Sequence, residues 1–339
     1  MMAGLTAGSA SWLVAAAAMV AGGLAALAWS SGVFVDGAAR VAKSLGISPF
    51  VVGMVVIGFG TSAPELCVSV LSGLSDHANL SLGNAYGSCV FNIAVILGVS
   101  AFICPLVTRP SATVVAGVGL AAIAGFSMLI LRDGRCTRAD ALSLLAAFAV
   151  LLPLYCWYDQ RSKKGAAAEA APGAEPARGR LLRDFARVAV GLVGLVASSH
   201  VLVQGAVSLA RGMGVSDLVI GLTVVAAGTS LPELASAIVS ARRGEHEFVL
   251  GNIIGSNLFN SLAVVGLACV LSPVDGFSPY VLSRDLPLNL LLSLSVLLFG
   301  LNWRRPASPG VIRRRLAVVW LLVFAGYTVL AFLQETGRM

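Results

Sequence analysis

Long apolar runs, separated by short polar segments, extend over almost the whole chain. A helix needs about 20 consecutive apolar residues to cross the ~30 Å hydrocarbon layer of a bilayer. By that criterion the pattern predicts ten membrane-spanning helices, at residues 11–43, 47–73, 78–104, 111–131, 138–157, 185–212, 215–241, 246–271, 284–302 and 313–334. The sequence therefore predicts an all-α polytopic membrane protein.

One polar segment, residues 158–184, is longer than the others and lies between the fifth and sixth predicted helices. It is rich in alanine, glycine, proline and charged residues, a composition typical of a solvated, flexible connector. Arginine and lysine indicate the orientation, because cytoplasmic loops carry an excess of them. With the N-terminus outside, 17 of the 23 basic residues fall on the inner side. We therefore expect both termini outside, this linker in the cytoplasm, and integration into the inner (plasma) membrane of a bacterium.

Composition agrees with the membrane assignment and narrows the class. Hydrophobic residues make up 58% of the chain and charged residues 12%, about half the charged fraction of a soluble domain. The net charge is +7, but the basic residues lie between apolar runs and form no patch interleaved with aromatics, so no nucleic-acid partner is predicted. The six cysteines show no C-x-x-C spacing. Neither a disulfide framework nor a zinc site is therefore predicted.

The chain contains an internal repeat. Residues 53–98 align without a gap on residues 221–266, shifted by 168 positions, and 17 of the 46 aligned positions are identical. The copies are five predicted spans apart, an odd number, so the second copy enters the membrane upside down. This predicts a first five-helix repeat (1–157), the cytoplasmic linker, and an inverted second five-helix repeat (185–339). Inverted repeats with broken helices at the centre are typical of secondary transporters that bind their substrate near the membrane midplane.

Each copy carries two polar motifs within apolar helix. The first is G-T-S-x-P-E, at residues 60–65 and 228–233, and the second is G-N-x-x-G-S-x-x-F-N, at residues 83–92 and 251–260. A carboxylate at the centre of a span costs about 3 kcal/mol or more and usually marks an ion or proton pathway. Proline has no N–H group, so it interrupts the helical hydrogen bonds and leaves carbonyl oxygens free.

Helical spacing places Thr61, Ser62 and Glu65 on one face, and Ser88 and Asn92 on one face of the next helix. The motifs thus offer carboxylates, hydroxyls, amides and carbonyls, with no imidazole or thiolate. Calcium takes about 6–8 oxygen ligands, whereas softer metals prefer nitrogen or sulfur. The residues indicate a site for a hard cation. The same residue types also fit structural roles, as hydroxyls bonded to helix backbone or amides that join helices.

The paired motifs resemble the two alpha repeats of the cation/calcium exchanger superfamily, in particular the sodium/calcium exchanger type and its bacterial relatives. The resemblance covers nearly the whole ten-span chain. It implies cation ligation by five side chains in each copy, namely Thr61, Ser62, Glu65, Ser88 and Asn92, and Thr229, Ser230, Glu233, Ser256 and Asn260. It also implies ligation by carbonyls near Gly58 and Ala226. Proton/calcium exchangers of the superfamily have Asn-Ala-Thr before the glutamate, and potassium-dependent exchangers have Asp at the position of Asn260, so the resemblance favours sodium coupling without potassium.

The predicted function is secondary active antiport, in which calcium and sodium compete for one midplane site and its occupancy permits alternating access. The alternative is a proton/calcium antiporter in which Glu65 and Glu233 carry protons. A cation pore fits inverted, broken helices less well, and a structural scaffold would not need them. An intramembrane hydrolase needs a Ser–His or Asp–Asp arrangement, which neither motif contains. We expect no enzymatic activity and no cofactor, with Ca²⁺ and Na⁺ as substrates and the lipid bilayer as surroundings. Outside the motifs, Asp36 is interpreted as a boundary or packing residue rather than a ligand, and His200 as an interfacial residue.

Overall fold

The structure, a computed structural model, describes residues 10–74, 78–164, 178–213, 226–305 and 308–335. Most of these residues are helical, because a helix satisfies its backbone N–H and C=O groups within one segment when no water is present. The first half contains α1 (Ala10–Leu45), α2 (Pro49–Val52), η1 (Gly53–Gly58), α3 (Phe59–Thr61), α4 (Ala63–Leu74), α5 (Ala78–Phe91), η2 (Asn92–Leu97), α6 (Gly98–Ile103), β1 (Leu106–Thr108), α7 (Pro110–Ile130), β2 (Arg135–Cys136) and α8 (Arg138–Lys164). The second half contains α9 (Arg178–Gly212), α11 (Ala226–Thr229), α12 (Leu231–Arg242), α13 (His246–Leu258), η5 (Phe259–Val264), α14 (Val265–Leu271), β3 (Val274–Asp275), η6 (Val281–Asp285), α15 (Leu286–Gly300), β4 (Gly310–Ile312) and α16 (Arg314–Glu335). The η segments are π-helical.

Eight helices among the described residues are long and apolar enough to cross a membrane. They coincide with eight of the ten predicted spans. The other two predicted spans, 47–73 and 215–241, are the interrupted ones. The first is divided into α2, η1, α3 and α4, and the second includes α11 and α12, while residues 214–225 lie outside the described chain. The helices that flank the predicted linker are longer than expected, since α8 ends at Lys164 and α9 begins at Arg178.

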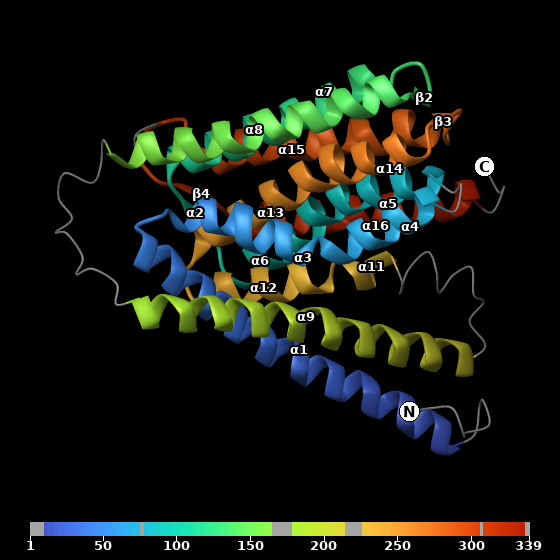
Figure 1. Cartoon of the computed structure of the whole chain (residues 1–339), viewed down its shortest axis with the longest axis horizontal. Helices are drawn as coiled ribbons and strands as arrows, with labels where there is room; N and C mark the ends of the chain where they lie inside the picture. The colour runs from blue at the N-terminus through green and yellow to red at the C-terminus, as the bar shows by residue number, and fades with distance from the viewer. Residues whose placement is uncertain (1–9, 75–77, 165–177, 214–225, 306–307, 336–339) are drawn as a thin grey trace.

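The long helices α1 and α9 lie side by side and run in opposite directions (Figure 1). Their contacts are reciprocal. A Cβ atom on Gly23 would lie 2.9 Å from Leu202, and one on Gly191 would lie 2.5 Å from Phe34. In the 168-residue repeat alignment, Gly23 is equivalent to Gly191 and Phe34 is equivalent to Leu202. The two contacts are therefore equivalent, with the roles of the two halves exchanged. This reciprocity is the signature of a two-fold axis that relates the halves.

Equivalent residues of the two halves also meet each other directly, which happens only on such an axis. The hydroxyl oxygens of Ser30 and Ser198 are 3.5 Å apart. Deeper in the bundle the Cys89 thiol lies 3.9 Å from the carbonyl oxygen of Asn257. In both pairs the two residues are 168 positions apart. The predicted inversion of the second repeat is therefore confirmed.

Two short antiparallel sheets lie at opposite ends of the helix bundle (Figure 1). In one sheet β1 pairs with β4, and in the other β2 pairs with β3. Leu106 is opposite Ile312 in the first, and Cys136 is opposite Val274 in the second. Each sheet joins a strand of the first half to a strand of the second. The two halves are thus connected at both ends of the bundle.

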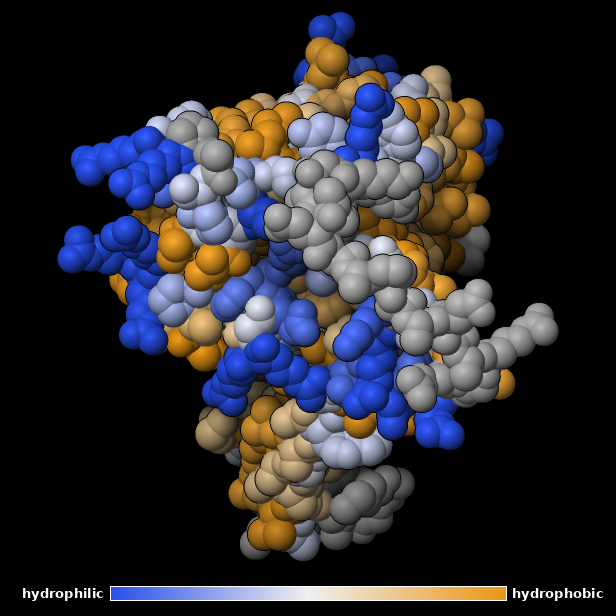
Figure 2. Space-filling view, turned by 90° about the vertical axis from the view of Figure 1, so that its left-hand side faces the viewer, coloured by the Kyte–Doolittle hydropathy of each residue, from blue (hydrophilic) through white to orange (hydrophobic). Residues whose placement is uncertain are grey.

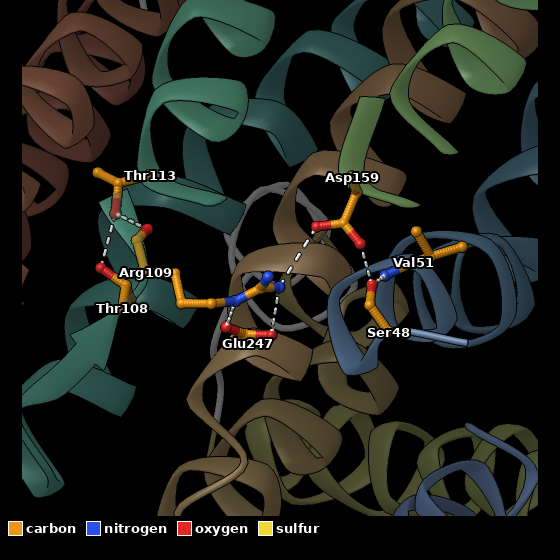
Figure 3. A network of polar contacts seen from close by, with 7 residues as sticks. All are labelled: Ser48, Val51, Thr108, Arg109, Thr113, Asp159 and Glu247. Carbon is orange, nitrogen blue, oxygen red and sulfur yellow. Dashed lines mark hydrogen bonds and ion pairs between the residues drawn. The ribbon is translucent and has the colours of Figure 1, made fainter. Parts of the chain in front are cut away.

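The end of the molecule that carries the C-terminus of α1 and the N-terminus of α9 presents many hydrophilic side chains, with apolar surface around them (Figure 2). A buried polar network lies at this end (Figure 3). The Arg109 guanidinium, just before α7, binds both carboxylate oxygens of Glu247 on α13. It also lies 3.3 Å from Asp159 on α8, which accepts a hydrogen bond from Ser48. Ser48 in turn caps α2 by accepting a hydrogen bond from the Val51 amide.

This network fixes the relative positions of α2, α7, α8 and α13 at one end. The Asp159 side chain is only 2% exposed, so its charge depends on Arg109 for compensation. Burial by itself lowers the pKa of Arg109, but the ion pairs with Glu247 and Asp159 raise it above its ordinary value. The guanidinium therefore stays charged.

Candidate cation site

Each G-T-S-x-P-E motif lies where one helical segment ends and another begins. The backbone leaves helical geometry at Ser62 (φ −82°, ψ 8°) and at Ser230 (φ −93°, ψ 10°). The next residues open α4 and α12, with Pro64 and Pro232 in the first turn. Proline is tolerated there because the N–H group that it lacks has no partner within a helix. The predicted breaks are confirmed in both copies.

The breaks bring each glutamate to the serine of the opposite copy. Ser230 donates a hydrogen bond to Oε1 of Glu65 at 3.1 Å, and Ser62 donates one to Oε1 of Glu233 at 3.2 Å. Glu65 is 0% exposed and Glu233 1%. The other oxygen of each carboxylate, Oε2, is buried and has no hydrogen-bond partner among the described residues. Each copy thus completes the surroundings of the other copy's carboxylate.

The neighbouring threonines lie beside the same carboxylates. The Thr61 hydroxyl donates to the carbonyl of Ile57 at 2.8 Å and is close to Glu233. Thr229 occupies the equivalent position and is close to Glu65. The structure therefore brings together the threonine, serine and glutamate of both first motifs.

The second motifs supply amides and a further hydroxyl. Ser256 is buried and donates to the carbonyl of Gly58, at 3.2 Å, so the carbonyl expected near the break lies within the site. Its oxygen is also 3.4 Å from Oδ1 of Asn252, whose amide donates to the carbonyl of Glu233 at 3.3 Å. This chain of contacts connects the second motif of the second half to the breaks in both halves.

The amide of Asn92 donates to Oδ1 of Asn257 at 2.8 Å. Oδ1 of Asn92 and Oδ1 of Asn260 are both buried and have no hydrogen-bond partner among the described residues. Ser88, on α5 one turn before Asn92, is also buried. Of the ten predicted ligands, nine are buried and Thr229 is partly buried.

Helix packing extends the reciprocal arrangement to these amides. α12, which carries Glu233, packs against η2, where Asn92 lies. α4, which carries Glu65, packs against η5, where Asn260 lies. Among the described residues, four buried acceptor oxygens in this region have no hydrogen-bond donor, two from carboxylates and two from amides. A buried acceptor without a partner costs about 1–3 kcal/mol, and carboxylate and amide oxygens are ligands of the kind that calcium takes.

Two residues of this region were not predicted from the sequence. Asn257 joins Asn92 to the carbonyl of Cys89, to which its own amide donates at 3.4 Å. Ser199 on α9 donates to the carbonyl of Gly228 at 2.8 Å, a carbonyl that lies at the break four residues before Pro232. A signal for Asn257 was present, because it is an amide in an otherwise apolar helix. Ser199 had no comparable signal.

A cavity of about 490 Å³ leads to the breaks along α9. Its lining includes Pro64, Gly228 and Thr229 of the motifs, together with His200 and Gln204 of α9. The ring of His200 lies 2.8 Å from the amide of Gln204, and both side chains are exposed. This cavity therefore lies along the C-terminal half of α9 and reaches residues of both G-T-S-x-P-E motifs.

A second cavity, of about 580 Å³, lies at the opposite end along α1. Asp36, Arg40 and Lys43 line it, and they are the repeat equivalents of Gln204, Ser208 and Arg211 in the first cavity. None of the described residues that line it belongs to a G-T-S-x-P-E motif. Asp36 is 3.0 Å from Arg40 and 3.9 Å from Arg243, so it forms ion pairs at this cavity.

The structure is a helical bundle of two inverted halves, and oxygen atoms that can ligate a cation are buried where its two broken helices meet. These features define a secondary transporter of cations. The chain matches the family described as sodium/calcium exchanger protein, over residues 15–157 and 184–333. It therefore belongs to the sodium/calcium exchanger family. It is an integral membrane protein that performs cation/calcium antiport, and the family consists of transporters rather than enzymes. The ions are its substrates and no cofactor is indicated.

Similar proteins cover nearly the whole chain. CaxA of Alkalimonas amylolytica, which carries the name of an antiporter, is 34% identical over 313 residues, or 91% of this chain and 96% of CaxA. The inner membrane protein YrbG of Escherichia coli (strain K12) is 33% identical over 302 residues, or 88% of this chain and 92% of YrbG. A solved structure of the sodium-calcium exchanger NCX_Mj, soaked with zero Na⁺ and Ca²⁺, superimposes with a TM-score of 0.77 at 28% identity. The superposition covers 94% of this chain and 98% of the NCX_Mj chain.

Proposed function

We propose that this protein exchanges Ca²⁺ for Na⁺ by alternating access at the site between the two breaks. The observation that carries the proposal is the reciprocal pairing of Glu65 with Ser230 and of Glu233 with Ser62. In each pair the carboxylate keeps one buried oxygen that has no partner in the described part of the chain. The proposed ligands are the ten motif residues Thr61, Ser62, Glu65, Ser88, Asn92, Thr229, Ser230, Glu233, Ser256 and Asn260.

The charge of the site favours calcium as one substrate. Two carboxylates balance one Ca²⁺, so the calcium-loaded site is neutral, and the hydroxyl and amide oxygens bring the ligand number into the range that calcium takes. The same oxygens are numerous enough to hold more than two Na⁺ ions instead. A sodium-loaded site of that kind carries a net positive charge. Asn260 adds no third carboxylate, which supports exchange without potassium.

The two cavities support alternating access. One reaches Pro64 and Thr229, whereas the described residues that line the equivalent cavity at the other end include none of either G-T-S-x-P-E motif. An antiporter needs a site that is reachable from one side at a time, and an inverted repeat can open the second path by exchanging the conformations of its halves.

We place both termini and the β2–β3 sheet outside and the β1–β4 sheet in the cytoplasm, in the inner membrane of a bacterium. This follows from the excess of basic residues at the end shown in Figure 2, where hydrophilic side chains gather. The proposed domains are residues 1–157 and 185–339, joined by a cytoplasmic linker at 158–184. YrbG is described as an inner membrane protein, which agrees with this location.

The test is calcium flux in proteoliposomes under an imposed sodium gradient, with the membrane potential clamped. If one surplus charge moves with sodium, 100 mV contributes about 2.3 kcal/mol and shifts the equilibrium calcium gradient about 50-fold. We expect sodium on the side opposite calcium to accelerate calcium release in a voltage-dependent way. Proton/calcium antiport, in which the carboxylates carry two protons, predicts flux that follows a pH gradient and ignores both sodium and voltage. That outcome would replace the proposal.

A further inference from the structure

Two buried cysteines from opposite halves of the chain meet beside the β2–β3 sheet. Cys136 is the last residue of β2 and lies opposite Val274 of β3. Cys269 is in the last turns of α14, which ends at Leu271, just before β3 begins. The sheet therefore brings the start of α8 next to the end of α14.

The packing of α14 against α8 places Cys269 at the level of Cys136. A Cβ atom on Gly266 of α14 would lie 3.1 Å from the carbonyl of Ala141 and 2.8 Å from the side chain of Leu145. Since the end of α14 adjoins the start of α8, the two helices are antiparallel. Cys269, three residues after Gly266 and on the same helical face, lies next to the residues that precede Ala141.

The Cys269 thiol is close enough to Cys136 to raise the pKa of Cys136 above its ordinary value. Both side chains are 0% exposed and belong to the same hydrophobic cluster. In the orientation proposed above, this end of the bundle faces the bacterial envelope, which is kept oxidising by proteins that exchange disulfides with thiols.

We propose that Cys136 and Cys269 form a disulfide in the mature protein. One S–S bond forms and two S–H bonds break. The two electrons reduce the disulfide of an oxidising exchange protein, and its two sulfurs take up the two protons as a dithiol. The bond closes a loop of 134 residues, counting both cysteines, and covalently joins the first half of the chain to the second at the outer end. Closing a loop of this length removes many conformations of the unfolded chain, so the bond stabilises the folded protein.

The experiment lyses aerobically grown cells in excess N-ethylmaleimide and denaturant, digests the purified protein, and analyses the peptides by mass spectrometry. We expect one cross-linked peptide pair that contains Cys136 and Cys269, lighter by two hydrogen atoms than the reduced pair. The cross-linked pair should be absent when reductant is applied before the maleimide, and absent in the Cys136→Ser and Cys269→Ser variants. Cys89 and Cys156 serve as internal controls and carry maleimide in every sample. We also expect the thermal midpoint of the wild type to fall on reduction, while that of Cys136→Ser does not change.

Maleimide on both Cys136 and Cys269 in the unreduced wild type overturns the proposal. A bond that appears only after an added copper–phenanthroline oxidant overturns it as well, because the native pair is then a dithiol. The proposal also requires the β2–β3 end to be outside. A separate reporter, Ser278→Cys on the exposed loop after β3, is labelled in intact cells by a membrane-impermeant maleimide if it is outside. This reporter distinguishes a wrong orientation from a pair that stays reduced.

Discussion

Gly255→Ala tests whether the candidate site depends on direct backbone contact between the two halves. A Cβ atom on Gly255 would lie 2.1 Å from the carbonyl oxygen of Met54 and 2.9 Å from its Cα. Ordinary van der Waals contact begins at 3.4 Å, so α13 and η1 must separate by about 1 Å or more. The neighbour is backbone and cannot rotate away. The cost therefore lies at the upper end of the usual range for overpacking, about 3 kcal/mol.

The separation also affects the site, because Ser256 follows Gly255 and donates to the carbonyl of Gly58 at 3.2 Å. We expect Gly255→Ala to lower the thermal midpoint in detergent by about 5 °C or more and to abolish calcium flux. The measurements are thermal unfolding monitored by size-exclusion chromatography, and calcium uptake into proteoliposomes at matched protein content.

Two other glycines serve as matched controls. At Gly60 the nearest atom to an added Cβ is the side-chain Cδ2 of Leu192, at 3.2 Å, which can move by a rotamer change. At Gly326 of α16 the added Cβ meets no described atom within 4 Å. We expect a mild effect for Gly60→Ala and none or slight stabilisation for Gly326→Ala. Equal effects at Gly255 and Gly60, which both belong to the motifs, would show that motif membership rather than the measured contact decides the outcome.

Three further predictions concern charge and hydrogen bonding. Glu65→Gln and Glu233→Gln should each weaken calcium affinity about 100-fold, since loss of one buried charge partner costs about 3 kcal/mol; isothermal calorimetry measures it, and normal affinity in a folded variant removes that residue from the site. Ser230→Ala should weaken calcium affinity about tenfold, because a hydrogen bond to a charged group contributes about 1.5 kcal/mol. The same calorimetry measures the affinity, and calcium flux at saturating calcium is compared between this variant and the wild type. Arg109→Gln should cost about 1–2 kcal/mol of stability, and adding Glu247→Gln should cost little more, since paired residues are not additive; full additivity would contradict the network.

The sequence was sufficient to predict the fold and the meeting of the two motifs. The 168-residue shift implied inversion, and inversion implied that Glu65 and Glu233 would be neighbours. The positions of Pro64 and Pro232 predicted the breaks correctly, because a proline interrupts the helical hydrogen bonds locally, whatever its tertiary neighbours.

The residues that were missed depend on tertiary neighbours. Ser31 and Ser199 are equivalent in the repeat, but Ser31 donates to the carbonyl of Ala28 in its own helix at 3.0 Å, whereas Ser199 donates to Gly228. The repeat alignment treats these two serines as equivalent, so it cannot predict that they form different hydrogen bonds. The π-helical turns are a second example. η2 and η5 begin at Asn92 and Phe259 and alter the helical register there, and no residue type in the sequence specifies that change.

The reciprocal bonds between the two motif copies have a consequence for the origin of the chain. A polypeptide with a single copy contains one glutamate and one serine, and the serine reaches only the glutamate of another copy. Such an ancestor could build the paired arrangement only as a homodimer of two chains inserted in opposite directions. In a single chain that holds both copies, the residues that face each other across the axis need not be identical. A homodimer must place the same residue opposite itself on its axis, whereas this chain places Cys89 opposite Asn257.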